Sequence, residues 1–324
     1  MFISFSGYLL LIFIILFIGL RPIDGRFFGD TANYNARYLQ LQLGSEMKIP
    51  ADVGWFYFMK ISSKLFSIHT FFTICSFIYV YPLYKLSKQL FNSYWFYSFV
   101  MFLVSFSFWN YGVNGVRNGA ACSLFLWGLC YREKKFVVAF FFLLAISFHK
   151  TLMLPIIAYV ITHFYNNPKI YFRGWLLSIP LSLVAGGAFI LLFTSLGFAD
   201  ERAAAYLTNQ DLEGTSAKTG FRWDFLFHSA FAVFAGWYFV FKRRFRDDFY
   251  FQLLNTYLIC NAFWVLVIQA NYSNRFAYLS WFMMAIVIIY PFLKGDFFKS
   301  QPLKMSNVVA AYFAFTYLMF FVYY

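Results

Sequence analysis

The sequence predicts an all-α fold: a polytopic integral membrane protein with about 11 transmembrane helices, at about 20 residues per span, plus a helical outer loop. Of its 324 residues, 62% are hydrophobic and only 12% are charged, which is too little charge to cover a soluble domain. The apolar residues form long blocks, as in membrane spans, and do not follow amphipathic spacing. Aromatic residues, 26% of the chain, suit lipid-facing and interfacial positions.

Apolar blocks follow one another along the whole chain. No Lys or Arg precedes the first block and no small-residue cleavage site follows it, so we expect a retained helix rather than a cleaved signal. The block 136–148 is short, and Pro155 follows it closely, which favours a broken helix continuing into 151–165. The expected segments are 5–20, 66–84, 94–111, 116–131, 136–148, 151–165, 174–197, 223–241, 249–270, 276–293 and 305–324.

Basic residues gather in alternate loops and predict the orientation. Together these loops hold 14 Lys and Arg against 4 Asp and Glu, a net charge of +10, and the other side has a net charge of +3. Because short cytoplasmic loops are enriched in Lys and Arg, the N-terminus and these loops are expected inside. The basic clusters within these loops are 84–88, 132–135, 168–173, 242–246 and 294–304, and the acidic residues counted include Asp247 and Asp248 directly after the fourth cluster. We expect 1–324 to form a single polytopic membrane domain, with outer loops at about 21–64 and 199–222.

The first outer loop has helical periodicity. Asp30, Tyr34, Arg37 and Leu41 follow one another at spacings that place them on one face of a helix. The following stretch 53–66 is amphipathic and is typical of a helix lying in the membrane interface.

Several classes of function are excluded or disfavoured. The net charge of +13 resides in loops, and no soluble basic domain is present to bind nucleic acid. We expect no metal and no cofactor, because HExxH, DxD, His/Cys clusters and Gly-rich phosphate loops are missing from the sequence. The four cysteines lie in apolar segments without CxxC spacing, as small buried residues do.

Ionisable residues gather at the outer ends of the expected helices, where they are costly unless they face a cavity or each other. Arginine stays charged and presents a planar fork that matches phosphate oxygens, so several arginines suit a diphosphate. Asp30 and His149 are the available proton acceptors. The residues of this outer set are Asp30, Arg37, Arg117, His149, Lys150, Arg222, Asp224 and Arg275.

Each residue of this set also has a structural interpretation. Asp30 is a possible helix N-cap, and His149 a possible partner of a backbone carbonyl at a helix break. Arginines at the membrane interface, and Lys150, often extend their head groups to water. Arg222 and Asp224 are close enough in sequence to pair with each other.

Five stretches resemble the EpsG family of bacterial exopolysaccharide and capsule proteins, relatives of the O-antigen (Wzy-type) polymerases. "VRNGAA" resembles the family's Arg-Gln-x-x-Ala motif, with Asn118 in the Gln place, which puts in doubt any role that needs the length of Gln. "AISFHKT" is similar to Phe-His-x-Ser, with Thr151 for Ser. "DVGWFYFMKI" has Asp52 and Val53 where Glu and Pro are commoner. The five stretches are 29–34, 52–61, 116–121, 145–151 and 274–279.

The resemblance implies a polymerase that joins undecaprenyl-diphosphate-linked oligosaccharides on the outer face of the inner membrane. The expected catalytic residues are Asp30, His149 and Arg117, with Asp30 preferred as the base and His149 as a substrate ligand. The expected substrate-binding residues are Tyr34, Arg37, Lys150, Arg275 and Arg222. The expected partners are the lipid-linked oligosaccharide, the bilayer and polysaccharide chain-length or export proteins.

Three other functions remain open from the sequence. A flippase for lipid-linked oligosaccharide also needs cations in a cavity, although transporters more often have internal repeats and charges near the midplane. A membrane acyltransferase fits a single His beside an apolar tunnel. A non-catalytic assembly partner in a polysaccharide complex is the third.

Overall fold

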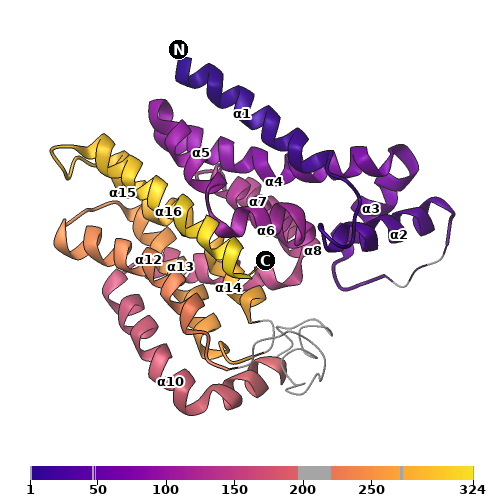
Figure 1. Cartoon of the computed structure of the whole chain (residues 1–324). Coiled ribbons are helices and arrows are strands. Elements are labelled where there is room, and N and C mark those ends of the chain that lie inside the picture. The colour runs from indigo at the N-terminus through magenta and orange to yellow at the C-terminus, as the bar shows by residue number, and fades with distance from the viewer. Residues whose placement is uncertain (1, 46, 48, 196–219, 271–272, 324) are drawn as a thin grey trace. The chain divides into compact units, whose positions relative to one another are not determined.

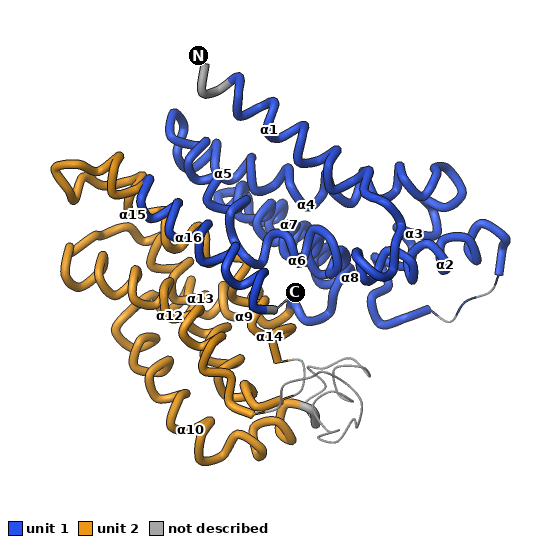
Figure 2. The backbone as a smooth tube through the Cα atoms, viewed as in Figure 1, with its two compact units in different colours: residues 1–152, 306–324 blue, residues 153–305 orange. Residues whose placement is uncertain are grey.

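Helices make up the regular secondary structure of the described residues, 2–45, 47, 49–195, 220–270 and 273–323, in this computed structural model (Figure 1). The predicted all-α class is therefore confirmed for that part of the chain. The chain divides into two compact units, Met1–Leu152 with Ser306–Tyr324 and Met153–Met305 (Figure 2).

The first unit is built around a central helix, α4, which packs against α1, α5 and α7, while α7 packs in turn against α8. Its elements are α1 (Phe2–Gly19), α2 (Asp30–Gln42), α3 (Val53–Leu65), α4 (Ile68–Phe91), η1 (Asn92–Tyr94), α5 (Trp95–Leu103), α6 (Phe106–Val113), α7 (Val116–Leu129), α8 (Lys135–Phe148), η2 (Lys150–Leu152) and most of α16 (Gln301–Tyr323).

Local sequence explains where α4 begins and ends. The Ser67 hydroxyl caps it by accepting a hydrogen bond from the Thr70 N–H at 3.2 Å. Asn92 ends it with a φ of 45°, a positive value that cannot continue a right-handed helix. Between these ends, buried side chains such as Phe71 and Phe72 form the core of the unit.

The predicted helical structure of the loop at 21–64 is confirmed, and it contains two helices, α2 and α3. Its outer placement stays a prediction. The Tyr38 hydroxyl lies 2.7 Å from the Ser62 carbonyl oxygen and 2.9 Å from that of Phe66, which ties α2 to the end of α3. Because α3 also packs against α8, the loop helices are attached to the helical core.

The expected segment 94–111 is interrupted. It divides at Val104 and Ser105 into α5 and α6, and the run that ends at Leu103 is bent by 70° against Phe106–Val113. The Ser105 hydroxyl donates to the Phe102 carbonyl at 2.7 Å, so a side chain replaces part of the helical ladder at the bend.

The predicted break near the His149–Lys150 pair is confirmed. Helix α8 ends at Phe148, His149 is extended at φ −152° and ψ 114°, and a short 3₁₀ turn follows. Pro155 lies in the first turn of the next helix, where the missing N–H of proline costs little.

The second unit is organised around α13, which packs against α9, α10 and α14. Asn261 on α13 accepts from Trp175 Nε1 at 2.7 Å and donates to the hydroxyls of Ser229 and Ser280. Its elements are α9 (Met153–Phe164), α10 (Pro168–Ser195), α12 (Trp223–Trp237), η3 (Tyr238–Lys242), α13 (Asp248–Leu266), α14 (Asn274–Trp281) and α15 (Met284–Lys294).

Five helices in the described residues are long and apolar enough to cross a membrane, or six if the bent pair is one span. They are Pro168–Phe193, Trp223–Lys242, Asp248–Leu266, Asn274–Lys294 and Gln301–Val322. Three shorter apolar helices, Phe5–Gly19, Lys135–Phe148 and Lys150–Phe164, accompany them. This is the helix content of a multi-pass membrane protein, and about 11 spans, at about 20 residues each, stays a prediction.

Candidate functional site

Asp52 joins three segments of the first unit. Its carboxylate Oδ2 lies 2.6 Å from Nη1 of Arg117, at the start of α7. Its Oδ1 accepts a hydrogen bond from the backbone N–H of Lys150 at 2.9 Å, at the break after α8. The Asp52 side chain is 5% exposed and that of Arg117 is 24% exposed. A buried carboxylate thus fixes an arginine that keeps part of its surface open.

Asp52 occupies this position because of where α3 begins. It is the residue before the helix, yet its side chain does not cap α3. A carboxylate at that position would ordinarily bond the first helical N–H groups. Here it bonds the Lys150 N–H and the Arg117 guanidinium, which belong to other elements.

Close packing between α3 and α8 brings the break against Asp52. A Cβ atom placed on Gly54 would lie 2.1 Å from the Ser147 hydroxyl oxygen, so only glycine allows this approach. Rings seal the same contact, because Trp55 meets Phe148 edge-on with centroids 5.6 Å apart and Phe58 stacks on Phe148 at 5.5 Å.

His149 has its ring oriented by the residue two positions later. Its Nδ1 accepts from the Thr151 backbone N–H at 3.4 Å and lies 2.8 Å from the Thr151 hydroxyl oxygen. With Nδ1 acting as an acceptor, the neutral imidazole carries its proton on Nε2. His149 is therefore set to donate a hydrogen bond from Nε2, which favours a ligand role over that of a base.

Tyr34 links the face of α2 to Arg117. Burial raises the pKa of Tyr34 to about 12, Arg117 and Arg37 act to lower it, and Asp30 acts to raise it. These influences place Arg117, Arg37 and Asp30 each within electrostatic range of Tyr34. The Tyr34 ring also meets Trp55 edge-on at 5.6 Å. At neutral pH Tyr34 is an uncharged phenol that can donate a hydrogen bond.

Solvent exposure of the side chains falls along the predicted face of α2, from its first residue toward its last turn. Asp30 is exposed, Tyr34 and Arg37 are half-buried and Leu41 is buried. Gly29 is the residue before the helix and Asp30 is its first residue. Asp30 is therefore not the N-cap, and its carboxylate at the positive end of α2 is open to solvent.

Six of the eight predicted site residues lie in the first unit, on three neighbouring parts of it. They are Asp30, Tyr34 and Arg37 on α2, Arg117 on α7, and His149 and Lys150 at the break. Asp52 and the Tyr34 electrostatics connect these parts. Grouping them in one site remains a proposal, taken up below.

Arg222 and Arg275 lie in the second unit. Arg222 makes two hydrogen bonds to Asp224, at 3.0 and 2.7 Å, and its guanidinium covers the Phe225 ring at 3.7 Å. The expectation that Arg222 pairs with Asp224 is therefore confirmed. Arg275 is exposed in the first turn of α14. The outer loop predicted at 199–222 lies outside the described residues up to 219.

Asp52, Thr151 and Trp55 are the functional candidates that the sequence prediction missed. Asp52 and Trp55 both fall in the stretch 52–61, and Thr151 follows directly on the His149–Lys150 pair. Their positions inside the family-like stretches were the available signal. Their partners lie far away in sequence, so the contacts themselves were not predictable.

The site offers positive charge and hydrogen-bond donors. Among the residues that the structure describes, no group of three or more His, Cys, Asp and Glu side chains is arranged to hold a metal ion. The arginines supply cations that suit phosphate oxygens, and Tyr34 and His149 supply neutral donors. Asp30 supplies an exposed carboxylate.

Comparison with known proteins identifies one family. The model of the EpsG family matches residues 6–324, nearly the whole chain. No curated protein and no solved structure gives a significant match.

Proposed function

Because the chain belongs to the EpsG family, we propose that it polymerises polysaccharide repeat units carried on undecaprenyl diphosphate. Family membership and the apolar helices indicate a membrane protein of polysaccharide biosynthesis. The finer assignment to a glycosyltransferase of exopolysaccharide, capsule or O-antigen synthesis is part of the proposal.

The observation that carries the proposal is that the Asp52 carboxylate holds Arg117 in place. Asp52 anchors Arg117 at 2.6 Å while the Arg117 side chain stays 24% exposed. A partly exposed, oriented guanidinium beside an apolar helix bundle suits the diphosphate of a lipid-linked sugar. Lys150 and Arg37, in the adjacent segments, add positive charge.

The proposed reaction transfers a glycan between two lipid carriers. A hydroxyl oxygen of the acceptor sugar forms a bond to the anomeric carbon of the donor glycan. The bond between that carbon and the diphosphate oxygen breaks, and the lipid diphosphate leaves with the bonding electron pair. The hydroxyl proton passes to a base. Energy comes from the activated donor, so no nucleotide is needed.

Arg117 acts on the leaving group in this scheme. Negative charge grows on the diphosphate as the glycosidic bond breaks, and a preorganised cation stabilises the transition state more than the ground state. Arg37 and Lys150 assist. Arg275 and Arg222 of the second unit remain proposed substrate ligands, and the Asp224 pairing of Arg222 makes it the weaker of the two.

Asp30 is the proposed base, and His149 the proposed ligand. Asp30 is an exposed carboxylate with no capping bond to hold it, so a sugar hydroxyl can reach it. His149 and Tyr34 donate hydrogen bonds to the diphosphate or to the acceptor sugar. We assign the role of ligand to His149, and not the role of base, because its contact with Thr151 directs the imidazole proton to Nε2.

The proposed setting is the outer face of the bacterial inner membrane. The charge of the alternate loops supports it, since the site residues lie on the less basic side. Chain-length and export proteins are the proposed partners, together with the bilayer.

Replacement of Arg117 tests the function. In membrane-inserted Arg117→Lys, which loses the planar fork, we expect long-chain polysaccharide to fall by about 100-fold while single lipid-linked units accumulate on the outer face. Arg117→Ala leaves the Asp52 carboxylate buried and unpaired, so Arg117→Gln combined with Asp52→Asn is the better neutral variant. Polymer length on gels and extracted lipid-linked units are the measurements.

The exposed Arg26 of the same outer loop supplies the matched control. Arg26→Lys should leave polymer length unchanged. Normal polymer in both Arg117 variants would reject the assignment of Arg117. Accumulation of single units on the cytoplasmic face would instead assign a flippase, and loss of acyl groups from polymer of normal length would assign an acyltransferase.

A further inference from the structure

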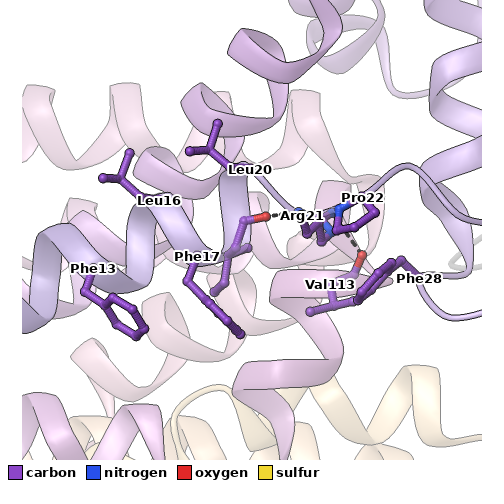
Figure 3. A pocket seen from close by; sticks show the side chains of 9 residues that line it. Phe13, Leu16, Phe17, Leu20, Arg21, Pro22, Phe28 and Val113 are labelled. Carbon is purple, nitrogen blue, oxygen red and sulfur yellow. Dashed lines mark hydrogen bonds between the residues drawn. The ribbon is translucent and has the colours of Figure 1, made fainter.

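A groove of about 500 Å³ lies along the outer part of α1 and the loop that follows (Figure 3). Phe13, Leu16 and Phe17 line it from α1, and Leu20 and Phe28 line it from the loop that follows. Its volume is in the range of ligand pockets, which begins at about 300 Å³. Its wall is almost entirely apolar, so an aqueous sugar is a poor occupant.

One charged side chain interrupts this apolar wall. Arg21 is only 6% exposed, and its Nη1 and Nη2 donate to the carbonyl oxygens of Ile18 and Val113, the latter at 3.1 Å. Its Nε is buried and has no hydrogen-bond partner among the described residues. A buried N–H without a partner costs free energy unless something accepts from it. The guanidinium also lies 5.0 Å from the centroid of the Phe72 ring. The groove thus combines apolar walls with one buried cation in its lining.

The groove adjoins the Arg117 site at a close contact between Gly29 and Asn114, which we call the joint. Phe28 and Val113 both line the groove. Gly29 directly follows Phe28 in the sequence, and Asn114 directly follows Val113. A Cβ atom on Gly29 would lie 2.8 Å from Asn114 Oδ1, and Gly29 has a φ of 42°, which side chains rarely adopt. Directly beyond this joint begin α2, with Asp30, and α7, with Arg117. All of these residues lie in the first unit.

We propose that this groove binds the isoprenoid chain of the lipid-linked substrate beside its diphosphate. The chain lies against the aromatic and aliphatic side chains of α1, Arg21 offsets the negative charge of the head group, and the diphosphate extends past Gly29 toward Arg117. This assignment rests on the proposed function and adds to it the place where the carrier lipid is recognised.

The features of the groove favour a single-chain isoprenoid over bulk phospholipid. A space of about 500 Å³ accommodates a segment of one slender chain better than a glycerophospholipid with two. The buried Arg21 cation in the lining suits an anionic head group. Proximity to the Arg117 joint matters only for a lipid whose head group takes part in the reaction.

Two leucines of α1 provide a matched pair of variants. Leu16 lines the groove and is 44% exposed, whereas Leu9 is on the same helix, is 53% exposed and does not line it. Purified protein in nanodiscs would be titrated with undecaprenyl diphosphate and, separately, with phosphatidylglycerol, and bound lipid counted by native mass spectrometry. Because tryptophan fills the groove, Leu16→Trp should weaken undecaprenyl diphosphate binding about tenfold. Leu9→Trp should bind as the wild type.

Equal binding by Leu16→Trp and Leu9→Trp would overturn the proposal, as would equal competition by phosphatidylglycerol, which would mark a site for bulk lipid. Arg21→Gln should also weaken binding, and the Leu16 variant keeps the test valid if Arg21→Gln does not fold.

Failure of the groove proposal can be distinguished from failure of the proposed function. If Arg117→Lys abolishes polymer while Leu16→Trp leaves binding unchanged, only the groove is wrong. If Leu16→Trp lowers binding while the Arg117 variants still make polymer, the groove stands and the polymerase assignment fails.

Discussion

Asp52 is the residue whose role the structure changes most. From the sequence it is an acidic residue before an amphipathic helix. In the fold its two oxygens hold Arg117 and the Lys150 N–H. Neither contact is local, so no helical spacing could reveal them. By contrast, the shared face of Asp30, Tyr34 and Arg37 follows from helical period alone, and the mutual influence on Tyr34 agrees with it.

Asp52→Asn should loosen Arg117 and cost about 1–3 kcal/mol of unfolding free energy, because one member of a buried charged contact is lost. Thermal unfolding in detergent measures the loss, and polymer synthesis should fall with it. A double-mutant cycle with Arg117→Gln is the sharper test. The double variant should lose less unfolding free energy than the sum of the losses in the two single variants. Strict additivity would mean that the 2.6 Å ion pair contributes nothing.

Thr151 sets the proton position on His149. Thr151→Val removes the hydroxyl at 2.8 Å, and we expect the imidazole to populate both neutral tautomers. Nitrogen-15 NMR of labelled His149 would report this, and polymer synthesis should fall roughly threefold to tenfold, as for the loss of a hydrogen bond that contributes about 1 kcal/mol. Thr151→Ser keeps the hydroxyl and serves as the control. A spectrum unchanged in the valine variant would remove Thr151 from the site.

Helix ends, rather than helix centres, carry the site at the scale of elements. The break after α8 was predictable, because a short apolar run ends at two ionisable residues with a proline nearby. The break between α5 and α6 was not, because it has neither Pro nor Gly and depends on Ser105 bonding back to Phe102. The contact of α3 with α8 was also hidden, because Gly54 gains its meaning only from Ser147.

Gly54→Ala should separate α3 from α8 and lower stability by about 1–3 kcal/mol, as overpacking does. A matched glycine lies in α10, where a Cβ on Gly174 meets nothing within 4 Å. Gly174→Ala should be neutral or stabilising by up to about 1 kcal/mol. Melting temperatures of the two variants in one detergent give the comparison. Similar melting temperatures would show that the α3–α8 approach is loose.

At the scale of the whole molecule, composition predicted the helical membrane class, and charge predicted the sidedness. The number of spans does not follow as easily, because five or six helices have the length and apolarity to cross unaided while several others are short. Short helices such as α5 and α6 depend on neighbours, and a window of apolar residues does not show where a helix bends. The role of Arg222 and Arg275, which lie in the second unit, likewise does not follow from charge patterns.

Sidedness is testable with single cysteines. The four native cysteines are buried and free, so background labelling should be low. A membrane-impermeant maleimide applied to spheroplasts should label Ser45→Cys between α2 and α3 and spare Lys134→Cys before α8. Permeabilised membranes, in which both should react, are the control. The reverse labelling pattern would invert the topology and place the Arg117 site in the cytoplasm.

The reach of Asp52 along the chain has a consequence for biosynthesis. Its bond to the Lys150 N–H joins residues 98 positions apart. At about 5–20 residues per second, the ribosome needs about 5–20 s to deliver the second partner after the first. During that interval the Asp52 carboxylate must stay hydrated, since burying it unpaired is costly. The segment that carries Asp52 therefore has to wait while α3 to α8 are synthesised. A truncated or stalled chain that ends before residue 150 would carry an incomplete, water-exposed site that quality-control proteases can recognise.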